Sequence, residues 1–108
     1  MVIDDHQRTG EAGVYAVGDL VATPALAHVG FAEAIVVIKD ILGEPVVPVD
    51  YGKVPWCIYC HPEVAFAGMS EEAAVEAGFE VVVKKDPYSG NGRAVIVGDT
   101  EGDRKSVV

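Results

Sequence analysis

The segment that most constrains this chain is the apolar run at residues 14–17, which leads directly into Gly18 and Asp19. A continuous apolar strand is what a parallel sheet buried on both faces requires. The carboxyl end of such a strand is where open α/β sheets hold ligands. Gly18 would let the backbone approach a ligand closely, and the Asp19 carboxylate can accept hydrogen bonds from hydroxyl groups. The alternative is an ordinary turn, since a strand followed by Gly-Asp also occurs without a ligand.

The residues after Asp19 predict a helix that opens at Thr23 or Pro24 and stops at Gly43. Proline is tolerated in a first helical turn, and glycine is favoured just beyond a helix end. Apolar side chains recur at helical spacing and then widen the stripe around most of the helix: Leu26, Phe31, Ala34, Ile35, Ile38 and Leu42, with Val36, Val37 and Ile41. A helix of this kind is typically buried between layers. We expect no covering layer for it within this chain.

The remainder of the chain predicts antiparallel strands around one short helix. Ser70 is a good N-cap for a helix that ends at Gly78. Strands are expected at residues 56–61 with a continuation at 64–68, at 79–83, at 93–97 and at 104–108, separated by a loop at 86–92 and a turn at 98–103. The predicted fold class is therefore α+β, with a strand and helix in residues 1–45 followed by a partial antiparallel sheet with a helix in residues 46–108.

Charge and hydropathy argue against two classes of partner. The chain has 17 acidic and 8 basic residues and a net charge of −9, whereas binding to a phosphate backbone needs clustered Lys and Arg. No apolar run approaches the ~20 residues that span a bilayer, and the polar start lacks the pattern of a secretory signal. We therefore expect a cytoplasmic protein that binds neither nucleic acid nor membrane, with both cysteines reduced.

Cys57 and Cys60 have the spacing of a redox pair or half a metal site, but we consider this interpretation the weaker one. Residues three apart in a strand point to opposite faces, and His61 would add only one further ligand without a second cysteine pair. Neither a GxGxxG nor a Walker A pattern occurs. We predict no catalytic residue and no metal ligand in this chain.

Several motifs occur in one order along the chain. They are Thr9 with Tyr-Ala-Val-Gly-Asp at 15–19, Pro-Ala-Leu-Ala-His at 24–28, the run at 54–68, Ser-Glu-Glu at 70–72 and Gly-Arg-Ala at 92–94. In this order and spacing the chain resembles the dihydrolipoyl dehydrogenases, a group of the FAD-dependent pyridine nucleotide-disulfide oxidoreductases. The resemblance spans roughly residues 9–108.

The resemblance implies an FAD site at the end of the predicted strand. Asp19, beside Gly18, would accept a hydrogen bond from a ribityl hydroxyl of FAD. The backbone at the start of the following helix would lie against the flavin ring, at Ala25, Leu26, Ala27 and His28. Helix N-terminal N–H groups favour the negative charge that a reduced flavin develops. The His28 side chain would have no catalytic role.

The resemblance also implies that this chain is one segment of an enzyme that oxidises dihydrolipoamide on a lipoyl-bearing protein and passes electrons through FAD to NAD. Residues 1–45 would be the C-terminal strand and helix of the FAD-binding domain, and residues 46–108 part of the dimerisation (interface) domain. The family's redox disulfide, nucleotide fingerprints and C-terminal histidine are missing. His61 does not replace that histidine, because Phe66 stands where the family's base segment needs Glu. We therefore expect the segment to be inactive in isolation.

Two departures from the family pattern fall on the helix beside the flavin. Val29 stands where many members have Lys, and Ala34 replaces the usual Gly. Two other functions stay open, namely a non-catalytic oligomerisation or interaction module and a fragment of a related disulfide or mercuric reductase. We expect a homo-oligomer, most simply a dimer, because the helix at 31–42 lacks cover and a strand at 104–108 has an unpaired edge. Exchange of the N-terminal strand and helix between two copies would cover both.

Overall fold

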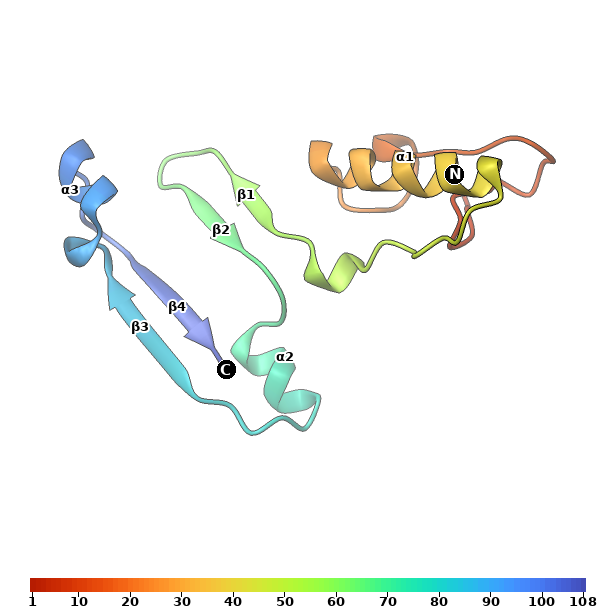
Figure 1. The fold of residues 1–108 in the computed structure, drawn as a ribbon. Helices are drawn as coiled ribbons and strands as arrows, with labels where there is room; N and C mark the ends of the chain where they lie inside the picture. Colours follow the sequence, from red (N-terminus) through yellow and green to blue (C-terminus); the bar gives the residue numbers. More distant parts are fainter. The chain divides into compact units, whose positions relative to one another are not determined.

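The computed structural model describes all residues, 1–108, and the chain divides into two compact units, Met1–Gly68 and Met69–Val108. The first unit contains η1 (Gly18–Leu20), α1 (Ala27–Leu42), η2 (Tyr51–Lys53), β1 (Trp56–Ile58) and β2 (Val64–Phe66) (Figure 1). The second contains α2 (Glu71–Glu76), β3 (Val83–Pro87), η3 (Tyr88–Gly90), α3 (Gly92–Val97) and β4 (Asp103–Val107). Helices accompany two separate two-stranded antiparallel sheets, so the predicted α+β class is confirmed. The domain division at residues 45 and 46 stays a prediction.

The predicted strand at residues 14–17 does not form. The segment is extended, but its only ladder contact is an antiparallel bridge between Tyr15 and Arg8. A strand is stable only beside further strands, and the first unit offers this segment no parallel neighbour. The expectation that Asp19 closes a strand is therefore corrected to a 3₁₀ turn that follows an extended segment.

Helix α1 begins three to four residues later than predicted and ends where predicted. The start is delayed because Leu26 is extended and its N–H donates to the Pro24 carbonyl at 2.8 Å, which closes a tight turn before the helix. At the other end Gly43 has φ 68°, and its N–H and that of Glu44 bond to the last carbonyls of the helix at 3.1 and 2.9 Å. This left-handed glycine cap terminates the helix.

The two faces of α1 differ in burial. Val29, Glu33 and Val36 are buried against the N-terminal segment, which contributes Ala16 and Val21 to the same small core. The opposite face is exposed at large apolar side chains: Phe31, Ile35, Ile38, Ile41 and Leu42. The prediction that this helix lacks a covering layer within its own chain is confirmed for this exposed face and is wrong for the face that packs against the N-terminal segment. None of the helices has the length and hydropathy needed to cross a bilayer.

Strands β1 and β2 form a hairpin rather than one continued strand. Trp56 pairs with Phe66, and their rings stack with centroids 5.7 Å apart and an interplanar angle of 8°. Because β1 ends at Ile58, Cys60 lies beyond the strand, and the prediction that both cysteines occupy one strand is wrong for Cys60. Both thiols are free and exposed.

In the second unit, the helix after Ser70 and the last strand occur as predicted within a residue or two. The Ser70 side chain accepts the Ala73 N–H at 3.1 Å, so it is the N-cap of α2. Strand β4 pairs antiparallel with β3, and Val83 is opposite Val107. The predicted strand at 79–83 is shifted, because pairing with β4 begins only near its last residue; the predicted loop at 86–92 correspondingly begins inside β3.

The predicted strand at residues 93–97 is wrong, because this segment is the short helix α3. Its β-branched residues favour a strand, but both flanks favour a helix. The Asn91 side chain accepts the N–H groups of Arg93 and Ala94 at 3.0 and 3.2 Å, and Gly98 caps the other end with φ 79°. The local caps outweigh the β-propensity of three side chains that stay exposed.

Candidate functional site

The turn at Gly18 and Asp19 lies beside α1 in the first unit. Gly18 has φ 69°, a conformation that glycine adopts without steric cost. Its carbonyl accepts the Val21 N–H at 3.0 Å, which closes the 3₁₀ turn η1. A Cβ on Gly30 would lie 3.7 Å from the Gly18 Cα, so the turn packs directly against α1. The Asp19 side chain is exposed within this turn and is accessible to an external donor.

The first turn of α1 presents backbone donors near the same place. Leu26 has no side-chain cap, and its carbonyl accepts the N–H groups of Val29 and Gly30 at 3.0 and 3.1 Å. The N–H groups of Ala27 and His28 precede those bonds and have no acceptor within the helix. Both residues are exposed, as is Ala25, while Leu26 is half-buried. The positive end of a 16-residue helix therefore faces solvent here.

The His28 side chain is directed to another part of the first unit. Its Nε2 lies 2.8 Å from the Pro55 carbonyl oxygen. A carbonyl can only accept, so Nε2 donates and carries the proton. This bond ties the start of α1 to the segment before β1. The contribution of His28 through its backbone stays a prediction.

A buried carboxylate connects the turn to the helix. Glu33 is 0% exposed. Its Oε2 accepts the Gly18 N–H at 2.6 Å, and its Oε1 accepts the Tyr51 hydroxyl at 2.9 Å. The Tyr51 oxygen in turn accepts Nε2 of Gln7 at 3.1 Å. Burial raises the pKa of Tyr51, so its hydroxyl keeps the proton that it donates to Glu33.

A second polar cluster surrounds Asp40, two helical turns further along the same face of α1. The Asp40 carboxylate accepts from His6 Nδ1 at 2.7 Å, from Arg8 Nε at 2.9 Å and from the Tyr15 hydroxyl at 2.7 Å. The Arg8 guanidinium is the largest cause that holds the pKa of Asp40 well below its usual range, followed by His6 and Tyr15. The Asp40 bond in turn raises the pKa of Tyr15. The cluster joins the N-terminal loop to the end of α1.

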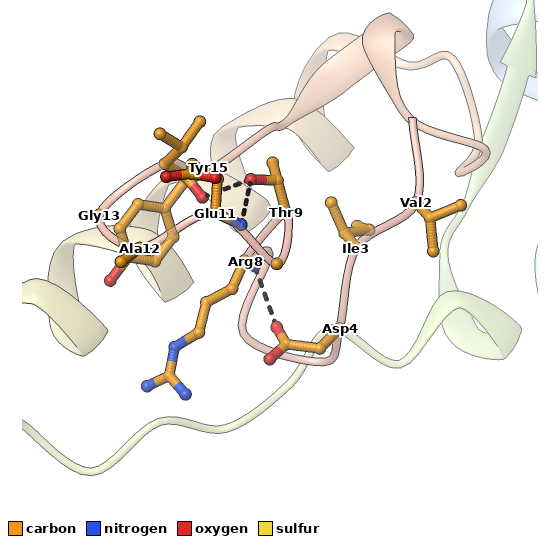
Figure 2. A pocket seen from close by; sticks show the side chains of 11 residues that line it. Val2, Ile3, Asp4, Arg8, Thr9, Glu11, Ala12, Gly13 and Tyr15 are labelled. Atoms are coloured by element: carbon orange, nitrogen blue, oxygen red, sulfur yellow. Dashed lines mark hydrogen bonds between the residues drawn. The ribbon is translucent and has the colours of Figure 1, made fainter.

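A hollow of about 600 Å³ lies in the N-terminal loop (Figure 2), and neither Gly18 nor Asp19 lines it. Several of its polar groups already have partners within the loop. The Asp4 carboxylate accepts the Arg8 backbone N–H at 3.0 Å, and the Thr9 hydroxyl donates to the Val14 carbonyl at 3.0 Å. In Figure 2 the Arg8 side chain extends away from Asp4, and its guanidinium is bound to Asp40. We assign this hollow no function.

Cys57 and Cys60 are not bonded to each other, and neither belongs to a network of polar side chains like those around Glu33 and Asp40. Cys60 Sγ donates to the Pro62 carbonyl oxygen at 2.9 Å, within the turn between β1 and β2. The chain contains no group of three His, Cys, Asp or Glu side chains placed to hold a metal ion. The Gly18 turn and the α1 N-terminus are thus the part of the structure best suited to bind a ligand with hydroxyl and anionic groups.

Comparison with known proteins identifies the class. Residues 54–108 match the dimerisation domain of the pyridine nucleotide-disulphide oxidoreductases. This match covers half of the chain, and the chain belongs to that family. The predicted resemblance is thereby confirmed at the level of the family.

The relatives are more specific. A dihydrolipoyl dehydrogenase from Rhizobium etli is 41% identical over 103 residues, which are 94% of this chain and 21% of the relative. The mitochondrial dihydrolipoyl dehydrogenase of Canis lupus familiaris is 47% identical over 100 residues, 93% of this chain and 19% of the relative. The chain thus spans about a fifth of the length of these curated relatives.

A solved structure shows the same fold. The HOCl-induced flavoprotein disulfide reductase RclA from Escherichia coli superimposes with a TM-score of 0.87 at 28% identity. The match covers 100% of this chain and 25% of RclA. The arrangement described above is therefore found within a larger flavoprotein.

Sequence reasoning placed Gly18, Asp19 and the α1 start together, and the structure does bring them together. It missed Glu33 and the chain of polar groups behind it, Tyr51 and Gln7. The available signal was an acidic residue inside an otherwise apolar helical run, because a charged residue on a buried face requires partners.

Proposed function

We propose that this chain is a segment of an FAD- and NAD-dependent dihydrolipoyl dehydrogenase, with the Gly18 turn and the α1 start as part of its FAD site. One observation carries the proposal: an exposed Asp19 carboxylate follows Gly18, which packs against Gly30 in the first turns of a helix whose leading N–H groups have no intrahelical acceptor. The similarity to dihydrolipoyl dehydrogenases over nearly the whole chain supports the choice of substrate.

The donor and acceptor set fits FAD. A sugar-alcohol chain offers hydroxyl donors to a carboxylate, and Asp19 is exposed. The flavin ring carries acceptor atoms that gain negative charge on reduction, and the N–H groups of Ala27 and His28 are free to donate to them. Gly18 has no side chain to obstruct this approach. FAD, when bound, would supply hydride and electron transfer.

The residues of this chain would bind and orient rather than react. Asp19 would hold the ribityl chain, and the α1 start would stabilise negative charge at the ring by a fixed dipole that needs no reorganisation. Residues 54–108 would contribute to contacts between subunits, consistent with their family match. The dithiol, the lipoyl-bearing partner and NAD would be handled by parts of the enzyme outside these 108 residues.

The direct test is Asp19→Ala in the complete enzyme that carries this segment. Removing a charge-assisted hydrogen bond should weaken FAD binding by about ten- to a hundredfold. Flavin retained after gel filtration, and the dissociation constant for FAD added back to apoenzyme, measure the effect. Glu44→Ala is the matched control, because Glu44 is an exposed acid beyond the opposite end of α1. Equal FAD affinity in both variants would reduce Asp19 to an ordinary turn residue.

The alternative function, a non-catalytic interaction module, is favoured by the exposed apolar face of α1. The two functions predict different flavin contents for the complete protein. A flavin-free complete protein with an intact oligomer would support the module, whereas stoichiometric FAD and dihydrolipoamide-dependent reduction of NAD would support the enzyme. A disulfide or mercuric reductase would bind FAD but would not turn over dihydrolipoamide.

A further inference from the structure

Glu33 is the most completely buried charged residue of the chain. Helix formation at this position does not require a carboxylate. Glu33 lies in the middle of α1, where its neighbours on the same face are Val29 and Val36. An apolar residue would fill this position at a lower cost of desolvation. The carboxylate is therefore present for what it contacts.

The contacts of Glu33 account for both of its oxygens. Oε2 accepts the Gly18 N–H at 2.6 Å, and Oε1 accepts the Tyr51 hydroxyl at 2.9 Å. Hydrogen bonds to an ionised acceptor are shorter and stronger than neutral ones, and the bond to Gly18 is the shorter of the two. Each oxygen thus has a donor from a segment outside α1, so the side chain links α1 to two other parts of the first unit.

The bond to Gly18 fixes the part of the backbone that orients Asp19. Gly18 is the first residue of η1 and adopts φ 69°, whereas Val17 before it is extended with φ −140°. The chain therefore changes direction at the N–H group that Glu33 holds. Asp19 is the next residue, so its exposed carboxylate is aimed by a backbone that Glu33 anchors to the helix.

The residues behind Glu33 are themselves held by hydrogen bonds. Tyr51 belongs to η2, and its oxygen accepts from Gln7, which is 2% exposed. Gln7 has φ 66°, and its carbonyl accepts the Ala16 N–H at 3.0 Å, two residues before Gly18. The hydrogen-bonded chain from Gln7 through Tyr51 to Glu33 therefore meets the backbone of residues 16–18 at both of its ends. Gln7 accepts from Ala16, and Glu33 accepts from Gly18. A supporting shell of this kind is how functional groups are held to within fractions of an ångström.

We propose that Glu33 is the positioning residue of the FAD site: it holds the Gly18 amide and thereby aims Asp19 and the turn at the start of α1. This inference rests on the proposed function, because it assigns to Glu33 a role in FAD binding that acts through Gly18 and Asp19. Glu33 itself is buried and does not touch the flavin.

The test compares Glu33→Gln and Glu33→Met with Asp40→Asn in the complete enzyme. Gln keeps one acceptor oxygen but replaces a charge-assisted bond by a neutral one, so the dissociation constant for added FAD should rise roughly fivefold. Met leaves the Gly18 N–H without an acceptor, and the rise should reach tenfold or more, because losing an acceptor entirely costs more than weakening the bond to it. Asp40→Asn is the matched control, because Asp40 is a carboxylate on the same helix that is 6% exposed and accepts from three residues, but lies two turns further along α1 than Glu33.

Two readouts separate positioning from general destabilisation. Asp40→Asn should lower Tm and leave the FAD dissociation constant within about twofold, because it alters stability without changing the turn. The visible circular dichroism of the bound flavin should change in both Glu33 variants and not in the control. Should Glu33→Met fail to fold, Glu33→Gln against Asp40→Asn decides alone.

The inference is overturned if Glu33→Gln binds FAD within twofold of the parent, or if Asp40→Asn weakens FAD binding as much. The proposed function fails separately: in that case the unsubstituted enzyme holds no FAD, or Asp19→Ala has no effect. If Asp19→Ala weakens FAD binding and Glu33→Gln leaves it unchanged, the proposed FAD site stands and only the role of Glu33 is removed.

Discussion

At the scale of single residues, Gly18 has the most demanding backbone position of the candidate site. Its φ of 69° lies in the left-handed region, and its N–H is bound by a buried carboxylate. A side chain here would meet no atom within 4 Å, so any penalty comes from the backbone conformation and not from crowding.

Gly18→Ala should therefore destabilise the protein by about 1–2 kcal/mol, the cost of a left-handed conformation for an L-residue. Gly30→Ala is the control, because its Cβ would make an ordinary 3.7 Å contact with Gly18 inside a regular helix. That substitution should be neutral or stabilising by up to about 1 kcal/mol. Thermal or urea unfolding measures both, and a loss of stability of the same size in the two variants would contradict the backbone argument.

At the scale of elements, the loop at residues 6–15 is joined to α1 by one carboxylate. Hydrogen bonds from Arg8, His6 and Tyr15 depress the pKa of Asp40 in the folded state. A depressed pKa contributes stability above the ordinary value near ~4, and this stability is lost as the pH falls through the folded-state pKa.

The parent protein should therefore lose stability as the pH falls below ~4, and Asp40→Asn should reduce this acid dependence. Because Asn cannot ionise, the variant should already be less stable at neutral pH, and the difference between the two proteins should shrink toward acid. Tm measured against pH tests this. A constant difference in Tm from neutral pH to pH ~2 would show that the Asp40 charge contributes nothing.

Helix α2 depends on its cap in a similar local way. It has only the residues Glu71–Glu76, and Ser70 Oγ accepts the Ala73 N–H at 3.1 Å. Ser70→Ala should cost about 1 kcal/mol, because a first-turn donor loses its acceptor. Ser89→Ala, at an exposed position in η3, should change stability by less than about 0.5 kcal/mol. Faster amide exchange confined to α2 would confirm the assignment, and equal effects of the two substitutions would contradict it.

At the scale of the whole molecule, the exposed face of α1 predicts association. Phe31 is 74% exposed, and Ile35, Ile38 and Leu42 are exposed beside it. Burial of each such side chain contributes about 1.5–3 kcal/mol, which is large against a total stability of ~5–15 kcal/mol. The membership of residues 54–108 in a dimerisation-domain family points in the same direction.

The isolated 108-residue chain should therefore be an oligomer, most simply a twofold dimer. Light scattering at low micromolar concentration measures the mass. Phe31→Glu should shift the distribution toward the monomer, because a charge on the exposed face of α1 opposes its burial, whereas Lys39→Glu, on the same helix, should have little effect. A monomeric mass with a cooperative melt would show that the chain is stable with this face in water.

What the amino-acid order determined by itself is chiefly local. Gly43 ends α1 and Ser70 begins α2 as predicted, because a glycine C-cap and a serine N-cap act through bonds to residues a few positions away. The collinear motifs likewise identified the family without any structure. The caps at Asn91 and Gly98 are equally local, and they outweigh the β-branched run between them, which by itself favours a strand.

The tertiary structure decided what depends on partners distant in the sequence. Residues 14–17 are apolar enough for a strand, but a strand exists only where another lies beside it, and only Arg8 does so here. Glu33 looked like one polar interruption of an apolar helix. Its burial, and its bonds to Gly18 and Tyr51, 15 and 18 residues away, arise only when three segments pack together. A carboxylate is stable in the interior only where such donors converge, and that convergence is a property of the fold.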